Sequence, residues 1–219
     1  LVPAALLGLD ITRLLDRAAG MAERCQQQED VKANPGAYLG AVMGSFAKNG
    51  RDKVTVIASP SLATFGLWVE QLLAESTGKE GTGLIPIAQE PVLKASAYGT
   101  DRCFVYLKLK GEKNGALDRA VQALTKAKHP VLQFDLRDRY DLGAEFFRWE
   151  CATAIAGHLL GIHPFDQPNV QESKDNTNRV LETFQSTGRL PEQVSSHPKD
   201  VAQDLANQLH PGTYLSVLA

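Results

Sequence analysis

Cysteine is scarce in this sequence and forms no recognisable framework. The 219 residues include three cysteines, Cys25, Cys103 and Cys151, with no Cys-x-x-Cys pair and no histidine at the spacing of a metal ligand. An odd number of widely separated cysteines argues against a secreted disulfide scaffold and against a structural zinc site. We therefore expect no metal ligands and a reducing, cytoplasmic setting.

Long apolar runs and clusters of basic residues are also missing. The longest apolar stretch, at residues 1–9, is interrupted by proline, whereas a membrane-spanning helix needs about 18 apolar residues or more. The 23 Lys and Arg residues are balanced by 25 Asp and Glu residues, for a net charge of -2. Without a basic run, neither nucleic acid nor a membrane is expected as the main partner, although a small anionic ligand fits.

What the sequence does contain is typical of a globular α/β domain. Hydrophobic residues make up 43% and charged residues 22% of the chain, which is close to average for a folded protein and sufficient for a sizeable core. The length corresponds to one domain with room for a small appendage. Because both ends are apolar and residue 1 is not Met, we expect the chain to be a piece of a longer protein.

Apolar periodicity predicts helices and strands in alternation. Asp10 is placed to cap a helix that reaches Cys25, and a second helix is expected over 38–49. The segments that follow are expected as strands at 54–59, 84–87, 103–109 and 129–136, and as helices at 61–76, 115–127 and 140–160. This alternation predicts a three-layer α/β fold with a mainly parallel sheet flanked by helices. In such sheets ligands bind at the carboxyl ends of the strands, where the strand order reverses.

The last third of the chain has a weaker core pattern. Helices are expected at about 170–186 and 199–209, followed by a terminal strand at 213–218. We divide the chain into three parts: lead-in helices over 1–52, an α/β domain over 53–186, and a C-terminal extension over 187–219 that begins a further unit.

The segment ESTGK, residues 75–79, holds the first candidate site residues. Gly78 is expected to close the preceding helix in a left-handed conformation, which places Glu75 in the last turn. There the carboxylate faces the negative end of the helix dipole, which favours its protonated form and suits a base that must take up and return a proton. The alternative is a solvated glutamate at a helix end. The glycine-rich stretch 78–83, which includes Lys79, is rejected as a phosphate loop because it follows a helix instead of preceding one.

The segment HPFDQPNVQESK, residues 163–174, holds the second group of candidates. An apolar helix ends just before it, and a new helix is expected to begin near Val170. Gln167, the free backbone N–H groups of the new helix and the ammonium group of Lys174 together suit an anionic sugar phosphate. The alternative is a turn between helices with a solvated lysine.

Together the two segments resemble the glucose-6-phosphate isomerase family, in its second sugar isomerase domain. The first is similar to the Glu-Ser-x-Gly-Lys element of the family, and the second to the signature Phe-Asp-Gln-x-Gly-Val-Glu-x-x-Lys. The positions of that signature that match are Phe165, Asp166, Gln167, Val170 and Lys174. Asn169 stands for the glycine and Gln171 for the glutamate, which changes the local turn and removes a charge.

The resemblance implies an enzyme that interconverts glucose 6-phosphate and fructose 6-phosphate without a metal or an organic cofactor. It implies that Glu75 moves a proton between C2 and C1 through a cis-enediol, and that Lys174 assists ring opening. Gln167 would form a hydrogen bond near the phosphate, and Lys79 would help to bind the substrate. A homodimer is implied for the full-length protein, because the family builds its site partly between subunits.

Several parts of the family's site have no counterpart in this sequence. An earlier sugar isomerase domain with a Ser/Thr-rich phosphate loop is absent, as is an arginine expected shortly before residue 1. The family's histidine would fall within 98–111, where Arg102 or Cys103 stands. The sequence is most similar to the isomerase portion of bifunctional transaldolase/glucose-6-phosphate isomerase fusions, which implies glycolysis, gluconeogenesis and the pentose phosphate pathway as context. We expect the isolated chain to be weak or inactive.

Two other classes of function compete with the enzyme. One is a non-catalytic sugar-phosphate-binding module, which needs no base such as Glu75 at the carbon end of the sugar. The other is a structural half-domain that contributes a dimer surface along the helix expected over 140–160. The residues proposed for that surface are Phe146, Phe147, Trp149 and Ile155.

Overall fold

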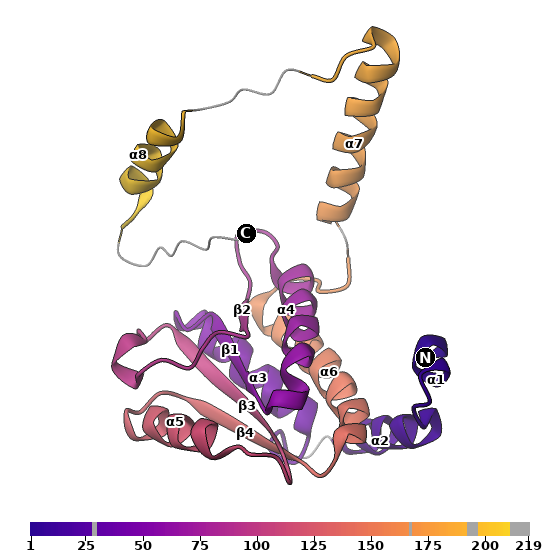
Figure 1. The fold of residues 1–219 in the computed structure, drawn as a ribbon, viewed down its shortest axis with the longest axis vertical. Helices are drawn as coiled ribbons and strands as arrows, with labels where there is room; N and C mark the ends of the chain where they lie inside the picture. Colours follow the sequence, from indigo (N-terminus) through magenta and orange to yellow (C-terminus); the bar gives the residue numbers. More distant parts are fainter. Residues whose placement is uncertain (28–29, 167, 192–196, 211–219) are drawn as a thin grey trace. The chain divides into compact units, whose positions relative to one another are not determined.

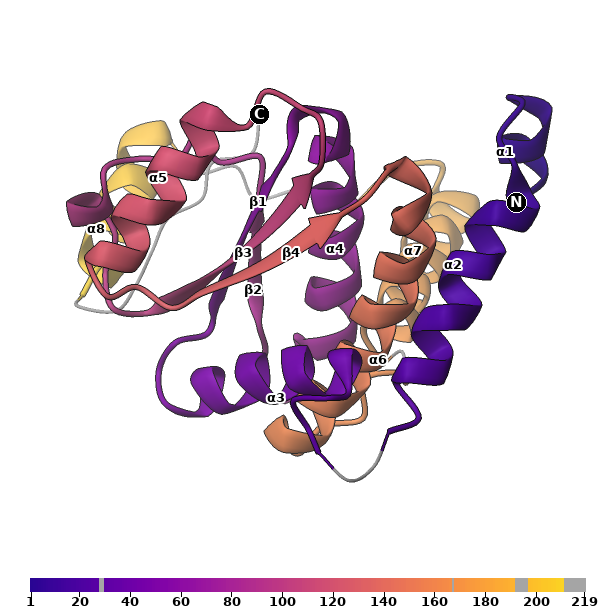
Figure 2. The ribbon, with the colours of Figure 1, turned by 90° about the horizontal axis from the view of Figure 1, so that it is seen from below.

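The structure, a computed structural model, describes residues 1–27, 30–166, 168–191 and 197–210. It divides into two compact units, Leu1–Asp166 and Gln167–Ala219. The first unit is an α/β fold in which a parallel sheet carries helices on both faces (Figure 1 and Figure 2). The fold class predicted from the alternating pattern is confirmed.

The sheet has four parallel strands in the order β2-β1-β3-β4. They are β1 (Lys53–Ala58), β2 (Ile85–Ala88), β3 (Arg102–Leu109) and β4 (Val131–Leu136). The central strands β1 and β3 are buried along most of their length. Both faces of a covered parallel sheet exclude water, which explains why these strands are continuous apolar runs without polar alternation.

Helices form the outer layers of this unit. Their bounds are α1 (Val2–Leu6), α2 (Ile11–Arg24), α3 (Pro35–Lys48), α4 (Ala63–Thr77), α5 (Gly115–Lys126) and α6 (Leu142–Leu160). Helix α6 packs against α2, α3 and α4 on one side of the sheet, while α5 covers the other face (Figure 2). The predicted cap of α2 is confirmed, because the carboxylate of Asp10 accepts a hydrogen bond from the backbone N–H of Arg13 at 3.0 Å.

Two apolar clusters lie on the two faces of the sheet. The larger joins β1 and β3 to α3, α4 and α6, and Met43, Val69 and Trp149 are fully buried in it. The smaller joins the opposite face to α5 through Phe104 and Tyr106. Both clusters lie within the first unit, so its stability comes from burial on both faces of one sheet.

Two aromatic residues of α6, Phe146 and Trp149, belong to the larger cluster. The ring of Phe146 packs edge-on against Phe65 and Trp68, with centroids 5.1 and 4.5 Å apart, and Trp149 is completely buried. The prediction that Phe146 and Trp149 form a dimer surface is therefore wrong. Periodicity alone does not distinguish an apolar helix face turned to the core from one turned to a partner.

The chain departs from the sequence predictions at one further point, in the turn after α4. Within the predicted lead-in helices, residues 2–6 form α1, in which Pro3 occupies one of the first helical positions, where its missing N–H costs nothing. Gly78 has φ of −72°, so the predicted left-handed cap is wrong. Positive φ values fall instead on Glu80 and Gly81, because the chain reverses tightly between Lys79 and Thr82.

The second unit contains α7 (Pro168–Thr187) and α8 (Pro198–Gln208). Both helices were predicted, whereas the predicted strand at 213–218 lies outside the described residues. Apolar side chains of α7, including Leu181 and Phe184, are about half exposed. Within the described ranges, no helix combines the length and the apolar composition needed to cross a bilayer.

Candidate functional site

The carboxyl edge of the sheet is the place where this topology puts a ligand. The chain passes from β1 to β2 on one side and then crosses to β3 on the other, so strand order reverses between β1 and β3. The loops that follow these two strands diverge there. The groups that follow β1, β2 and β3 are therefore the first place to look for a site.

Ser59, directly after β1, ties the two diverging loops together. Its buried hydroxyl donates to Oδ1 of Asn114 at 2.7 Å and accepts from the N–H of Leu109 at 2.8 Å. The side-chain amide of Asn114 donates to the carbonyl of Leu109 at 2.8 Å. Because these bonds are buried, they hold the ends of β1 and β3 in a fixed relation.

The turn that leads from Ser59 into α4 offers hydrogen-bond donors at this edge. The short helix η1 (Pro60–Leu62) precedes α4; Pro60 has no N–H, and the N–H of Leu62 donates to the carbonyl of Ser59 at 2.8 Å, which leaves the N–H of Ser61 directed outside the helix. The backbone N–H of Ser61 donates to a carboxylate oxygen of Glu112 at 3.4 Å. A negative group of the protein thus lies where an anionic group of a ligand would be stabilised.

Glu90, which follows β2, is a carboxylate that the sequence patterns did not single out. Gln89 has a positive φ of 56° and turns the chain sharply after the strand. Oε2 of Glu90 lies 3.1 Å from Nη1 of Arg102. Glu90 also lines a cavity of about 180 Å³ together with the end of β1, Ala63 at the start of α4, and Leu117 of α5. The available signal was an acidic residue just past a predicted strand, at the edge where ligands bind.

Arg102 and Cys103 occupy the positions where the family's histidine was expected. Nη1 of Arg102 also donates to the hydroxyl of Thr55 at 3.1 Å, and its guanidinium lies 4.8 Å from the ring centre of Tyr98. Burial raises the pKa of the Cys103 thiol to about 12, so this thiol stays protonated near neutral pH. Arg102 thus holds Glu90, and Cys103 contributes to the core.

Glu75 lies at the opposite edge of the sheet. It is exposed in the last turn of α4, as predicted. Because α4 returns from the end of β1 to the start of β2, its last turn lies near the amino ends of these strands. The loop after it lines a hollow with Asp52 and Ile85, which flank those strand starts. The carboxylate of Glu90, in contrast, is paired with Arg102, the first residue of β3, which lies opposite Lys53 at the start of β1.

Lys79 joins the first predicted segment to the second. Its ammonium group donates to the carbonyl of His163 at 2.9 Å, to the carbonyl of Asp166 at 2.5 Å and to Oδ1 of Asp166 at 2.7 Å. The ammonium group of a lysine has three N–H donors, and all three are used here. The Lys79 side chain is only 4% exposed, so it binds the 163–166 turn and has no donor free for a ligand in this arrangement.

The residues of the second segment from 167 onward belong to the second unit. Lys174 is exposed on α7, and Gln167 lies outside the described residues. The contact that the structure shows between the two segments is the pair formed by Lys79 and Asp166. The hydrogen bond and charge of Lys79 hold the pKa of the Asp166 carboxyl below its usual range.

Comparison with known sequences points to one kind of enzyme. No protein-family model matches the chain. Curated relatives include the glucose-6-phosphate isomerase of Leptospira biflexa, which is 26% identical over 83% of this chain and 48% of its own length. That of Methanocaldococcus jannaschii is 29% identical over 83% of this chain and 53% of its own length. The chain thus spans about half the length of the curated relatives it matches.

Comparison with solved structures gives the same fold. A hypothetical protein from Thermus thermophilus matches with a TM-score of 0.70 and 20% identity, over 82% of this chain and 52% of that one. A glucose-6-phosphate isomerase from Chlamydia trachomatis matches with a TM-score of 0.63 and 18% identity, over 89% of this chain and 45% of that one. The parallel sheet and its helices are thus arranged as in these two solved structures.

Proposed function

We propose that this chain is part of an aldose–ketose isomerase that interconverts glucose 6-phosphate and fructose 6-phosphate. The observation that carries the proposal is its similarity, over 83% of its length, to curated proteins named glucose-6-phosphate isomerase. The fold and the pre-organised carboxyl edge of its sheet support it. Because the chain spans about half of those relatives, the complete site needs residues beyond the ones that align.

The reaction requires a carboxylate that reaches two neighbouring carbons. The base takes the proton from C2 of the open-chain aldose while O1 gains a proton, which gives a cis-enediol. The base then delivers the proton to C1 while O2 loses its proton, which gives the ketose. Such a carboxylate is most effective when it is partly shielded from water and held in one position. No metal or organic cofactor takes part in this proposal.

Two carboxylates compete for the role of base. The resemblance assigns it to Glu75, which is exposed at the amino edge of the sheet. Glu90 lines a cavity past the end of β2, but its carboxylate is paired with Arg102 at 3.1 Å, and an ion pair with a guanidinium group makes a carboxylate a weaker base. We propose Glu75 as the base and keep Glu90 as the rival. Lys174 for ring opening and Gln167 near the phosphate remain part of the proposal, whereas Lys79 acts by anchoring the 163–166 turn.

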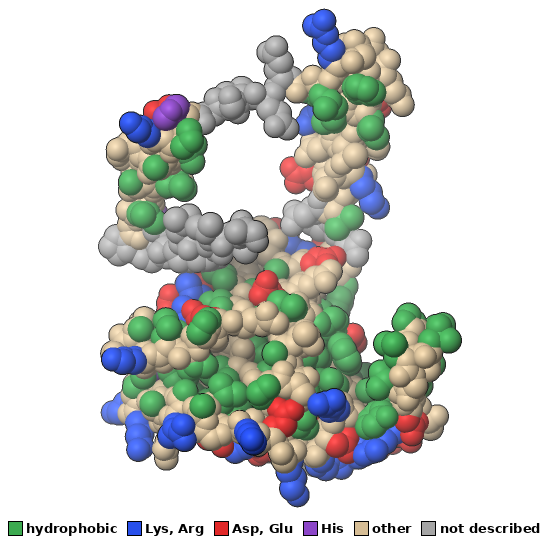
Figure 3. Space-filling view, viewed as in Figure 1, with side chains coloured by type: hydrophobic (Ala, Val, Ile, Leu, Met, Phe, Trp, Pro, Cys, Tyr) green, Lys and Arg blue, Asp and Glu red, His purple; other side chains and the backbone are tan. Residues whose placement is uncertain are grey.

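The partners and the cellular location of the chain are also part of the proposal. Helix α1 carries exposed leucines and contains no buried residue, and its apolar side chains form a projecting patch in Figure 3. A patch of this kind is typical of a contact with further protein, which supports a homodimer or a longer chain such as a transaldolase fusion. A cytoplasmic location and a role in sugar-phosphate metabolism follow from the same proposal.

Isotope exchange tests the function and the choice of base together. The chain is incubated with fructose 6-phosphate in heavy water, and deuterium entry at C1 and C2 is followed by NMR. Broadening of the NMR signals of the sugar phosphate reports whether it binds. We expect Glu75→Gln to abolish exchange while binding is retained, and Glu90→Gln to leave exchange nearly unchanged. Both variants are first checked by circular dichroism, because the test requires folded protein.

Each other outcome has a distinct meaning. Loss of exchange in Glu90→Gln alone would assign the base to Glu90. Binding without exchange in the unmodified chain would favour the non-catalytic sugar-phosphate-binding module. Absence of both binding and exchange would contradict the proposal for this chain.

A further inference from the structure

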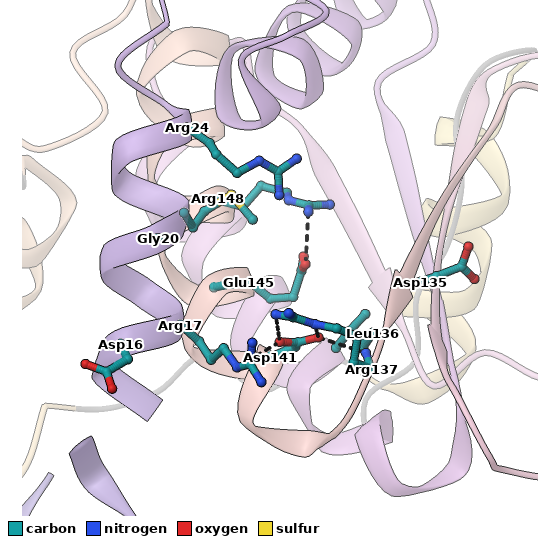
Figure 4. A pocket seen from close by; sticks show the side chains of 12 residues that line it. Asp16, Arg17, Gly20, Arg24, Asp135, Leu136, Arg137, Asp141, Glu145 and Arg148 are labelled. Carbon is teal, nitrogen blue, oxygen red and sulfur yellow. Dashed lines mark hydrogen bonds and ion pairs between the residues drawn. The ribbon is translucent and has the colours of Figure 1, made fainter. Parts of the chain in front are cut away.

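A second cavity, of about 440 Å³, lies between α2, α6 and the end of β4 (Figure 4). It shares no lining residue with the cavity beside Glu90. Charged side chains dominate its wall, and those used below are Arg17, Arg24, Arg137, Asp141, Glu145 and Arg148. A hollow of this size holds a small organic molecule rather than a single ion.

Two charged residues on the wall are buried and incompletely paired. Glu145 is 3% and Arg148 8% exposed, and Nη2 of Arg148 lies 3.3 Å from Oε1 of Glu145. Nε and Nη1 of Arg148 and Oε2 of Glu145 are buried without a hydrogen-bond partner among the described residues. Buried charged groups of this kind are costly unless something satisfies them.

The orientation of Arg148 is fixed by packing. Its guanidinium carbon lies 3.9 Å from the ring centre of Phe134, so the planar group is stacked on an aromatic face. Burial lowers the pKa of Arg148, the nearby Glu145 carboxylate opposes this effect, and the positive charge of Arg24 adds to it. The two guanidinium groups are therefore close enough to repel each other, as Figure 4 also shows.

The arginines on the wall fall into two pairs. Arg137 donates to both carboxylate oxygens of Asp141, at 2.7 and 3.0 Å, and Arg17 lies 3.4 Å from the same carboxylate. The exposed side chain of Arg24, in contrast, has no hydrogen bond or ion pair with the described residues. The charges of Arg17 and Arg137 are therefore balanced within the protein, at least in part by Asp141. Arg24 and Arg148 still have N–H groups that can donate to a ligand.

The geometry selects the chemistry of that ligand. Two guanidinium groups carry two positive charges, which a phosphoryl group can balance with its charge of up to two and its three acceptor oxygens, whereas a carboxylate carries a single negative charge. The unpaired oxygen of Glu145 beside them suits a hydroxyl group of the same molecule. We propose that this cavity binds a small hydroxylated phosphate monoester, with its phosphoryl oxygens on Arg24 and Arg148 and a hydroxyl group at Glu145.

The test uses glycerol 3-phosphate as the probe, with inorganic phosphate and glycerol as comparisons. The ¹⁵N–¹H spectrum of the chain is recorded during each titration. We expect glycerol 3-phosphate to shift the backbone signals of 20–24 and 141–148 and the indole signal of the neighbouring Trp149. Inorganic phosphate should bind more weakly at the same place, and glycerol should cause no shift.

Variants decide whether the arginines are responsible. Arg24→Gln should weaken binding of glycerol 3-phosphate about tenfold or more, and Arg24→Lys should weaken it less, because the charge remains but the planar fork is lost. The matched control is Arg13→Gln, on the same helix and outside the cavity, where Arg13 pairs with Asp138 at 2.5 Å. It should leave binding unchanged, as should Glu90→Gln.

Three results would overturn the proposal. One is an absence of shifts around the cavity. Another is an equal loss of affinity for glycerol 3-phosphate in Arg24→Gln and Arg13→Gln, which would indicate unspecific attraction of the phosphate to positive charge. The third is binding of inorganic phosphate as tight as that of glycerol 3-phosphate, which would exclude a site built for the organic part. Because the readout is binding at a separate cavity, none of these results depends on the proposed isomerase activity.

Discussion

Glu145 is a carboxyl group held in the interior beside other charges. It is 3% exposed, and burial raises its pKa to about 7, with Asp141 adding to the shift while Arg148 and Arg24 oppose it. In the unfolded chain the same group titrates near its ordinary value of 4.5. Between these two values the folded state holds a proton that the unfolded state has lost.

This difference makes stability depend on pH in a defined direction. As the pH rises from about 4.5 to about 7, the free energy of unfolding should fall by about 3 kcal/mol through Glu145, and this term should be constant above pH 7. Glu145→Gln removes the titrating group, so its stability should fall less across the same window. Urea unfolding at a series of pH values measures both proteins. Glu150→Gln, exposed on the same helix, is the control, and parallel curves for the original chain and Glu145→Gln would contradict the assignment.

Single residues were predictable from the sequence where their partners are local. The cap formed by Asp10 is such a case, because its partner is three residues away. Lys79 was predicted to bind the substrate, whereas its acceptors in the structure lie 84 and 87 residues further along the chain and could not be read from local sequence. Glu90 could not be recognised, because its place at a cavity depends on the strand order and on residues of α4 and α5.

At the scale of secondary-structure elements, the close packing of helices depends on glycines. A Cβ atom at Gly40 of α3 would lie 2.4 Å from the carbonyl oxygen of Ala152 and 2.7 Å from Cβ of Ile155, both on α6. Helices α3 and α6 can therefore approach closely only while this position has no side chain. The positions of the helices could be predicted from periodicity, but this close contact could not, because it involves segments more than 100 residues apart.

Two glycine substitutions should have opposite effects on stability. Gly40→Ala should lower the free energy of unfolding by about 1–3 kcal/mol, since backbone atoms of α6 must shift. Gly20→Ala, in the middle of α2, meets nothing within 4 Å and should raise it by about 0.5–1 kcal/mol through helix propensity. Urea unfolding of the two variants beside the original chain measures both. Equal effects would show that α3 and α6 are not in close contact.

At the scale of the whole molecule, the sequence and the structure draw the main boundary in different places. The sequence pattern extends the α/β domain to residue 186, because the periodic helix after 170 looks continuous with it. The structure assigns residues from 167 onward to a second unit. A long amphipathic helix has the same pattern whether it packs on its own domain or on another protein, so the boundary at 186 stays a prediction.

Truncation distinguishes the two boundaries. Both apolar clusters lie before residue 167, and side chains of α7 from 171 to 182 are exposed. A chain ending at Asp166 should therefore unfold cooperatively, with a melting temperature within about 2–4 °C of a chain ending at residue 186. A chain ending at Asp141 lacks α6, and with it Trp149, so it should not fold. Circular dichroism melts of the three chains provide the measurement. A clearly lower melting temperature at 166 than at 186 would show that α7 contributes to the stability of the sheet domain.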